Sequence, residues 1–339
     1  MKVRVLTTFF AVFILIGVIV SPCRPQQKVV IRFSHGLPES HSVAIQYKEW
    51  ANLIYERSKG HVKIELYPAA QLYKDQDAVK AVQMGTIEAG AFYAFNLDKI
   101  IREYRIFTVP FTFYTLEDAS AILNSDIRTM LEKKAESQSI KVLAFIPYGP
   151  PEAEGLLAKT LLRTPSDCRG KMFRAIDETV ANLIKLWGGG AVFLSGAELY
   201  MALQRGTIHG TVANLSQLVE RKLYEVAPFH TVLPYAFVPA LVTVNASFFG
   251  KLPQEAQEII VKTSKEIENK AFQVTTRKAY EDNLKFLRDR GLPLPYKPTK
   301  EEMALWTKGV DSIRESAIKD IPDGIALLKR IDQMVGKRK

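Results

Sequence analysis

An arginine within an apolar segment is the residue of this sequence best suited to binding chemistry. Arg174 stands between Phe173 and Ala175 in the segment 171–176, whose hydrophobic residues predict a short strand. A buried guanidinium without an anionic partner costs several kcal/mol, so Arg174 needs a carboxylate, another anion or water. An ion pair with one of the protein's own acids, or a place on an edge strand, would be a purely structural role. Alternatively, Arg174 binds the carboxylate of a small ligand through two parallel hydrogen bonds.

The other reactive residue types do not form the patterns of an enzyme or a metal centre. The five histidines form no His-Glu-x-x-His motif, and the sequence has no Gly-x-Ser-x-Gly segment. Ser34 stands next to His35, but a catalytic triad also needs a carboxylate that orients the histidine. The two cysteines, Cys23 and Cys168, stand far apart, so no cysteine cluster supports a zinc or iron site. We therefore expect no catalytic residue, no metal site and no cofactor.

Length and composition are typical of a two-domain globular protein. The chain has 339 residues, of which 47% are hydrophobic and 24% charged. A formal net charge of +10 could suit nucleic acid, an anionic surface or acidic ligands. The basic residues are scattered, however, and many alternate with acids along helices without forming a basic face interleaved with aromatic residues. We expect a solvated surface and no nucleic-acid partner.

The first 26 residues have the pattern of an export signal. Two basic residues precede an apolar run at 6–20, which is short for a membrane span. We expect cleavage near Gln26 and a periplasmic mature protein, with a retained anchor as the alternative. The residues before Cys23 weakly resemble a lipoprotein cleavage box, so lipid anchoring at Cys23 is a further alternative, although Pro22 argues against it.

Strand and helix patterns alternate in the part that follows. The hydrophobic spacing predicts strand, helix, strand, helix and strand in turn, at residues 29–36, 40–58, 61–67, 75–84 and 86–93. Such an order is typical of an α/β unit with a mostly parallel sheet. Proline and glycine at 147–151 predict a crossing into a second domain, and a strand at 240–245 returns to the first.

A long helix is predicted near the C-terminus and is expected to brace both domains. Residues 253–290 have no glycine or proline after the first position, which allows a helix of roughly 55 Å. We expect an α/β fold with two lobes: an N-terminal domain at 27–149 plus 240–279, and a C-terminal domain at 150–239 plus 280–339. Ligands of open α/β sheets bind at the carboxyl ends of strands, so the predicted site lies in a cleft between the domains.

The stretch from Thr164 to Asn214 resembles the solute-binding proteins of TRAP (tripartite ATP-independent periplasmic) transporters. The matching residues stand in order at Thr164, Pro165, Asp167, Gly170, Lys171, Arg174, Gly189, Gly190, Glu198, Tyr200, Ala202, Leu203, Gln204, Gly206 and Gly210. Further similar segments stand at 33–35, 59–60, 67–72, 85–88 and 109–113, so the resemblance covers about residues 29–290.

The resemblance implies a function as well as a fold. It implies a bilobed periplasmic-binding-protein-like fold that captures a small organic acid, with Arg174 on its carboxylate, and delivers it to the membrane subunits of a TRAP transporter. A monomer is expected, although some members of the family dimerise through an added C-terminal helix. An enzyme or a sensor input domain on the same scaffold is the alternative.

Some positions depart from the family's pattern. Many members carry a second arginine about 20 residues before the one that Arg174 matches, and this sequence has Glu154 there. A carboxylate in the cleft would repel a second ligand carboxylate and favour a hydroxyl or an amine, unless Glu154 lies on the surface. His209 replaces an aspartate, and Ala213 stands where an asparagine often contacts the ligand, so Asn214 is predicted to substitute.

Five further residues are candidates for the cleft. Ser34, His35 and Tyr93 stand at predicted strand ends of the first domain, and Tyr235 and Phe237 stand near the expected hinge. Each also has a structural alternative, because a turn histidine often hydrogen-bonds its own backbone and aromatic residues often fill a core.

Overall fold

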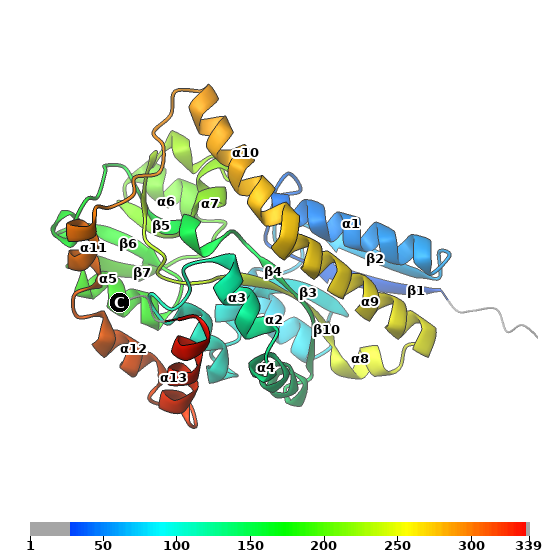
Figure 1. Ribbon diagram of the computed structural model, residues 1–339. Coiled ribbons are helices and arrows are strands. Elements are labelled where there is room, and N and C mark those ends of the chain that lie inside the picture. The colour runs from blue at the N-terminus through cyan, green and yellow to red at the C-terminus, as the bar shows by residue number, and fades with distance from the viewer. Residues whose placement is uncertain (1–27, 337–339) are drawn as a thin grey trace, which may run out of the picture.

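Two five-stranded sheets form two lobes in the computed structural model, which describes residues 28–336 (Figure 1). The first lobe contains the sheet of order β2-β1-β3-β10-β4. Its strands are β1 (Val29–Ser34), β2 (Val62–Tyr67), β3 (Ala89–Tyr93), β4 (Ile140–Pro147) and β10 (Pro239–Asn245). Strand β1 pairs in parallel with β2 and β3, whereas β10 runs antiparallel to β3 and β4. The returning strand predicted at 240–245 therefore belongs to the first sheet.

The second lobe contains the sheet of order β7-β6-β8-β5-β9. Its strands are β5 (Glu154–Ala158), β6 (Met172–Ala175), β7 (Gly190–Phe193), β8 (Gly210–Asn214) and β9 (Phe229–Val232). Strand β6 is parallel to β7 and β8, and β5 is antiparallel to β8 and β9. Arg174 lies on β6, inside this sheet and not at its edge.

Helices cover the sheets of both lobes. Those that accompany the first sheet are α1 (Ser42–Arg57), α2 (Asp75–Gln83), α3 (Leu116–Leu123), α4 (Asp126–Ser137) and α8 (Ala246–Gly250), with the short turns η1 (Ala94–Asn96) and η2 (Arg102–Thr108). The second sheet is accompanied by α5 (Glu178–Leu186), α6 (Leu199–Arg205) and α7 (Leu215–Glu220), with the turns η3 (Pro151–Ala153), η4 (Pro165–Cys168) and η5 (Leu223–Glu225). Each lobe has its own hydrophobic core, with Phe33 and Trp50 in the first and Phe173 and Trp187 in the second.

The long helix spans both lobes, as Figure 1 shows. It consists of α9 (Gln254–Lys270), a π-helical turn η6 (Ala271–Thr275) and α10 (Thr276–Asp289). Helix α9 packs on the first lobe, where Trp50 Nε1 donates to Ser264 Oγ at 2.9 Å. Helix α10 packs against α7 of the second lobe. The π-helical turn therefore marks the place where the helix passes from one lobe to the other.

The C-terminal segment returns to the first lobe. Helices α11 (Lys300–Thr307), α12 (Val310–Ile318) and α13 (Gly324–Met334) follow the long helix. Trp306 is buried in the second-lobe core, but Ile331 of α13 is buried in a core of the first lobe, and Arg330 pairs with Asp126. All of 280–339 was predicted to belong to the second domain. The apolar face of α13 instead packs against α3.

Within residues 28–336, none of the helices is both long enough and apolar enough to cross a membrane. The predicted export signal at 1–26, with Cys23, lies outside the described residues.

Candidate ligand-binding site

Arg174 is buried between the lobes without an acidic partner. Phe173 and Ala175 pack into the second-lobe core, so the alternation of β6 directs Arg174 to the opposite face of the sheet. Arg174 is 7% exposed, and its Nε donates to the carbonyl oxygen of Leu194 at 3.0 Å. Among the described residues, no carboxylate forms an ion pair with this guanidinium. Desolvation lowers the pKa of Arg174, and the purely structural ion pair considered above is not formed.

A small cavity adjoins Arg174 and is lined from both lobes. Its volume is about 20 Å³, and its lining residues are Tyr93, Phe95, Tyr148, Glu154, Arg174, Ile176, Gly196, Val212, Gln217, Arg221, Tyr235 and Val238. A second space of about 30 Å³ shares Tyr93, Phe95 and Arg174 and continues toward Lys74, Asp75 and Ser195. These volumes hold only a few water molecules, so the lobes stand close together around Arg174.

Arg221 is a second guanidinium in this cavity, and the sequence analysis did not identify it. It follows the last residue of α7, where its Nη1 donates to Gly196 O at 3.1 Å and its Nε to the hydroxyl of Tyr148 at 3.4 Å. A basic residue at a helix C-terminus is common because it complements the helix dipole. The sequence therefore gave no local reason to separate Arg221 from an ordinary helix end.

Glu154 faces the cavity but is held in an environment that favours its neutral form. The residue is 2% exposed at the start of β5, and Asn214 Nδ2 donates to its Oε1 at 3.1 Å. Desolvation raises the pKa of Glu154 to about 8, although hydrogen bonds from Asn214 and Tyr235 oppose the shift. At neutral pH most of this carboxyl group is protonated. The physical basis for the expected repulsion of a second ligand carboxylate is therefore weak.

Asn214 lies beside the cavity, and both Nδ2 and Oδ1 of its amide are hydrogen-bonded to other groups of the protein. Nδ2 donates to Pro150 O at 3.2 Å as well as to Glu154, and Oδ1 accepts the N–H of Ser216 at 3.2 Å. Asn214 thus caps α7 at its first turn and holds Glu154 in position. It is not among the residues that line the Arg174 cavity. Its geometry fits a positioning residue better than the ligand contact that was predicted.

The remaining candidates divide into two groups. Tyr93 and Tyr235 line the cavity, and the Tyr93 ring stacks on Phe95. Ser34, His35 and Phe237 do not line it.

Each of these three side chains is placed by local packing. His35 Nδ1 accepts the N–H of Leu37 at 3.3 Å, and burial lowers the pKa of His35 to about 4, so the ring is neutral. Ser34 is fully buried, and its Oγ has no hydrogen-bond partner within the described part of the chain. Phe237 belongs to the first-lobe core, where its ring centroid lies 5.7 Å from that of Phe113. The crossing segment has already reached the first lobe at this residue, because Phe237 N donates to Phe107 O.

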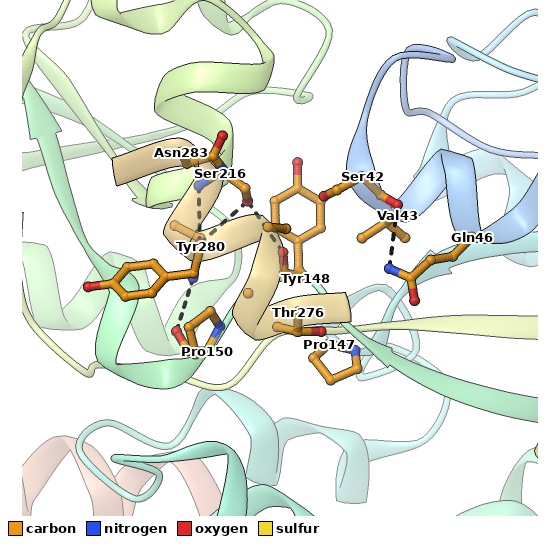
Figure 2. Close-up of a pocket in the computed structure, with 13 residues that line it drawn as sticks. Ser42, Val43, Gln46, Pro147, Tyr148, Pro150, Ser216, Thr276, Tyr280 and Asn283 are labelled. Carbon is orange, nitrogen blue, oxygen red and sulfur yellow. Dashed lines mark hydrogen bonds between the residues drawn. The ribbon is translucent and has the colours of Figure 1, made fainter. Parts of the chain in front are cut away.

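Tyr148 connects the cavity with a pocket on the hinge side, which Figure 2 shows between α1, α7 and α10. His41 Nε2 is hydrogen-bonded to the Tyr148 hydroxyl at 2.8 Å, and His41 Nδ1 faces the N–H of Val43 and the carboxylate of Glu220. The same hydroxyl accepts from Arg221 Nε. On the hinge side, Ser216 Oγ donates to Tyr148 O at 3.3 Å (Figure 2).

The described residues contain no group of three or more histidine, cysteine, aspartate or glutamate side chains arranged to hold a metal ion. The site therefore offers guanidinium groups, tyrosine hydroxyls and one neutral carboxyl group. Such a set suits an oxyanionic ligand.

Comparisons with known proteins identify the family of the chain. A family model described as bacterial extracellular solute-binding protein, family 7, matches residues 33–320. The 2,3-diketo-L-gulonate-binding periplasmic protein YiaO of Escherichia coli is 25% identical over 310 residues, covering 90% of this chain and 92% of its own. The C4-dicarboxylate-binding periplasmic protein DctP of Rhodobacter capsulatus is 25% identical over 291 residues, covering 85% of this chain and 86% of its own.

Solved structures share the fold at lower identity. A TRAP periplasmic solute-binding protein from Sulfurospirillum deleyianum with bound succinate aligns with a TM-score of 0.82 at 22% identity, covering 91% of this chain and 99% of its own. A sugar-acid-binding protein from Advenella mimigardefordensis with galactonate aligns with a TM-score of 0.84 at 20% identity, covering 92% and 99%. The family model spans most of the chain, and the solved structures share its two-lobed fold. The chain therefore belongs to the bacterial extracellular solute-binding proteins of family 7, which serve TRAP transporters.

Proposed function

We propose that this protein captures a small organic acid in the periplasm and delivers it to the membrane subunits of a TRAP transporter. The observation that carries the proposal is Arg174, a buried guanidinium in a cavity between two lobes with no acidic partner among the described residues. Relatives named for 2,3-diketo-L-gulonate and for C4-dicarboxylates support an acidic ligand.

The hydrogen-bonding capacity of Arg174 suits a carboxylate. A guanidinium has five N–H donors, and the only protein acceptor that the described residues provide is Leu194 O on Nε. This bond fixes the plane of the guanidinium while the two terminal nitrogens remain available. A carboxylate can therefore accept two parallel hydrogen bonds there, which orients the ligand as well as binding it.

Binding on this scaffold requires movement of the lobes. A cavity of about 20 Å³ is too small for an organic acid, so the ligand enters when the lobes are further apart. Tyr93 contributes from the first lobe and Arg174 from the second. Ligand contacts made by both lobes stabilise the closed state, which the membrane subunits then recognise. A monomer is sufficient for this cycle.

The role is binding without turnover. The alternative of an enzyme or a sensor input domain on the same scaffold would need a ligand that is consumed or a signalling partner. Ligand recovered chemically unchanged after prolonged incubation supports capture, whereas conversion would support the enzyme.

A thermal-shift screen followed by calorimetry tests the proposal. Succinate, malate, gulonate and galactonate are the probes, and a ligand present at ~100 times its dissociation constant adds about 2.7 kcal/mol of stability. Arg174→Ala should weaken binding of the selected acid by about 30-fold to several thousand-fold, because truncation of one partner of a buried charge pair costs roughly 2–5 kcal/mol. Arg169→Ala is the control, since Arg169 is an exposed arginine of the same lobe. Unchanged affinity in a folded Arg174→Ala variant would overturn the proposal.

A further inference from the structure

Arg221 and Arg174 line one cavity and approach it from different elements of the second lobe. Arg174 comes from the middle of β6, and Arg221 from the end of α7. Neither guanidinium forms an ion pair with a carboxylate of the described residues. Two cationic groups thus share a space that is largely withdrawn from water.

The acids around the cavity do not balance these charges. Glu154 is the acid that lines the cavity, and desolvation raises its pKa to about 8. Asp75 lies in the adjoining space and feels both guanidiniums, but it forms no ion pair with either. Desolvation raises the pKa of Asp75. Even when ionised, this single carboxylate beside two guanidiniums offsets only part of their charge.

Arg221 also retains donors for a ligand. Its Nε and Nη1 donate to Tyr148 and Gly196, which leaves Nη2 with no acceptor in the described part of the chain. The bond to Gly196 comes from the second lobe, and the bond to Tyr148 from the segment where the chain crosses between the lobes. Together they hold the guanidinium at the cavity wall. The group is therefore oriented before a ligand arrives, which lowers the entropic cost of binding.

We propose that Arg221 is the second anion-binding residue of this cavity and that it makes the protein select acids with two oxyanionic groups over acids of the same size with one. The inference rests on the proposed function, since it assigns Arg174 to the first anionic group. A dianionic ligand engages both guanidiniums. A monoanionic ligand leaves the half-buried Arg221 without an acceptor of full charge, and this unpaired charge opposes closure.

Matched ligand pairs separate charge from size. Succinate and succinamate differ by one carboxylate replaced by a carboxamide, and galactarate and galactonate differ by one carboxylate replaced by a primary alcohol. Calorimetry on the purified protein should show, for one pair or both, that the diacid binds about 30-fold more tightly than its monoanionic counterpart, or tighter still. A difference of this size is expected for one desolvated charge contact.

Substitutions of Arg221 test the residue itself. Arg221→Gln should abolish this selectivity, lowering the affinity for the diacid by about 30-fold while the affinity for the monoacid changes less than about 3-fold. Arg221→Lys keeps the charge but loses the planar fork, so it should recover part of the selectivity. Lys222→Gln is the control, because it removes the charge of the adjacent exposed residue. Melting temperatures of all variants report whether they fold.

The outcomes distinguish this inference from the proposed function. Equal losses for diacid and monoacid in Arg221→Gln, or a wild-type protein that prefers the monoacids, overturn the role of Arg221 but leave Arg174 as the carboxylate-binding residue. Binding of no acid, or binding that survives Arg174→Ala, overturns both. A folded Arg221→Lys variant with no more selectivity than Arg221→Gln also contradicts the role of the second charge.

Discussion

The Glu220 carboxylate of α7 accepts the backbone N–H of Ser42 at 2.6 Å, at the first residue of α1, and so joins the second lobe to the first. The same carboxylate accepts from Ser42 Oγ at 3.1 Å and from Asn283 Nδ2 of α10 at 2.9 Å. A carboxylate at a helix N-terminus is favoured by the helix dipole. This contact lies on the hinge side, beside the pocket of Figure 2, and not among the residues that line the Arg174 cavity.

Glu220→Gln should lower ligand affinity without changing any ligand contact. The substitution removes the charge that holds the two lobes together, so the closed state becomes less populated and the apparent dissociation constant rises by roughly 3- to 10-fold. Calorimetry with the best acid measures this, and small-angle scattering of the free protein should show a larger radius of gyration. Arg277→Gln is the control, because the Arg277–Glu117 pair also joins α10 to the first lobe but its side chains are exposed, so it should contribute little. Equal effects of the two substitutions would contradict the role of Glu220.

Glu154 should make the folded protein less stable as the pH rises. Its pKa is about 8 in the folded state, against an ordinary value of 4.5. The folded state therefore keeps a proton that the unfolded state loses, so the free energy of unfolding falls between pH 4.5 and pH 8. Glu154→Gln removes this dependence. Its stability relative to wild type should increase from pH 5 to pH 8 by up to about 4 kcal/mol.

Denaturant unfolding of both proteins at several pH values measures the effect of Glu154. Glu281→Gln, at an exposed position of α10, shows how much of the change follows from removing any glutamate. If the difference in unfolding free energy between wild type and Glu154→Gln is the same at pH 5 and pH 8, the pKa of Glu154 is not raised and the prediction is wrong.

Gly149→Ala should disturb the hinge segment. A Cβ atom at Gly149 would lie 2.2 Å from Oδ1 of Asn214, which caps α7 and holds Glu154. Because the amide of Asn214 is fixed by four hydrogen-bonded groups, it cannot move away without losing partners, and we expect a loss of about 1–3 kcal/mol of stability. Thermal unfolding measures the change. Gly250→Ala is the matched control, since a Cβ there would meet no atom within 4 Å apart from its chain neighbours and the backbone of its own helix. A drop of the same size in that variant would refute the steric explanation.

The sequence alone determined the alternation of strands and helices, the crossing after β4 and the long helix. These features follow from local residue patterns: hydrophobic spacing decides strand or helix, and proline with glycine at 147–151 ends the strand. Arg174 was also identifiable locally, because a charged residue within an apolar strand is conspicuous without knowledge of the fold. The position of α13 was not identifiable from local patterns, because its apolar face would fit either lobe. Only its packing against α3 places it on the first lobe.

Tertiary structure decided the remaining composition of the site. Arg221 belongs to it because α7 ends beside Tyr148 and Gly196, and a sequence shows a helix end but not what the end faces. Asn214 and Phe237 both lie near the hinge. The amide of Asn214, however, is hydrogen-bonded to neighbouring protein groups, and the ring of Phe237 fills a core of the first lobe. The charge state of Glu154 likewise depends on burial, which is a property of the folded chain. The sequence supplied the functional groups, and the closeness of the two lobes determined which of them face one cavity.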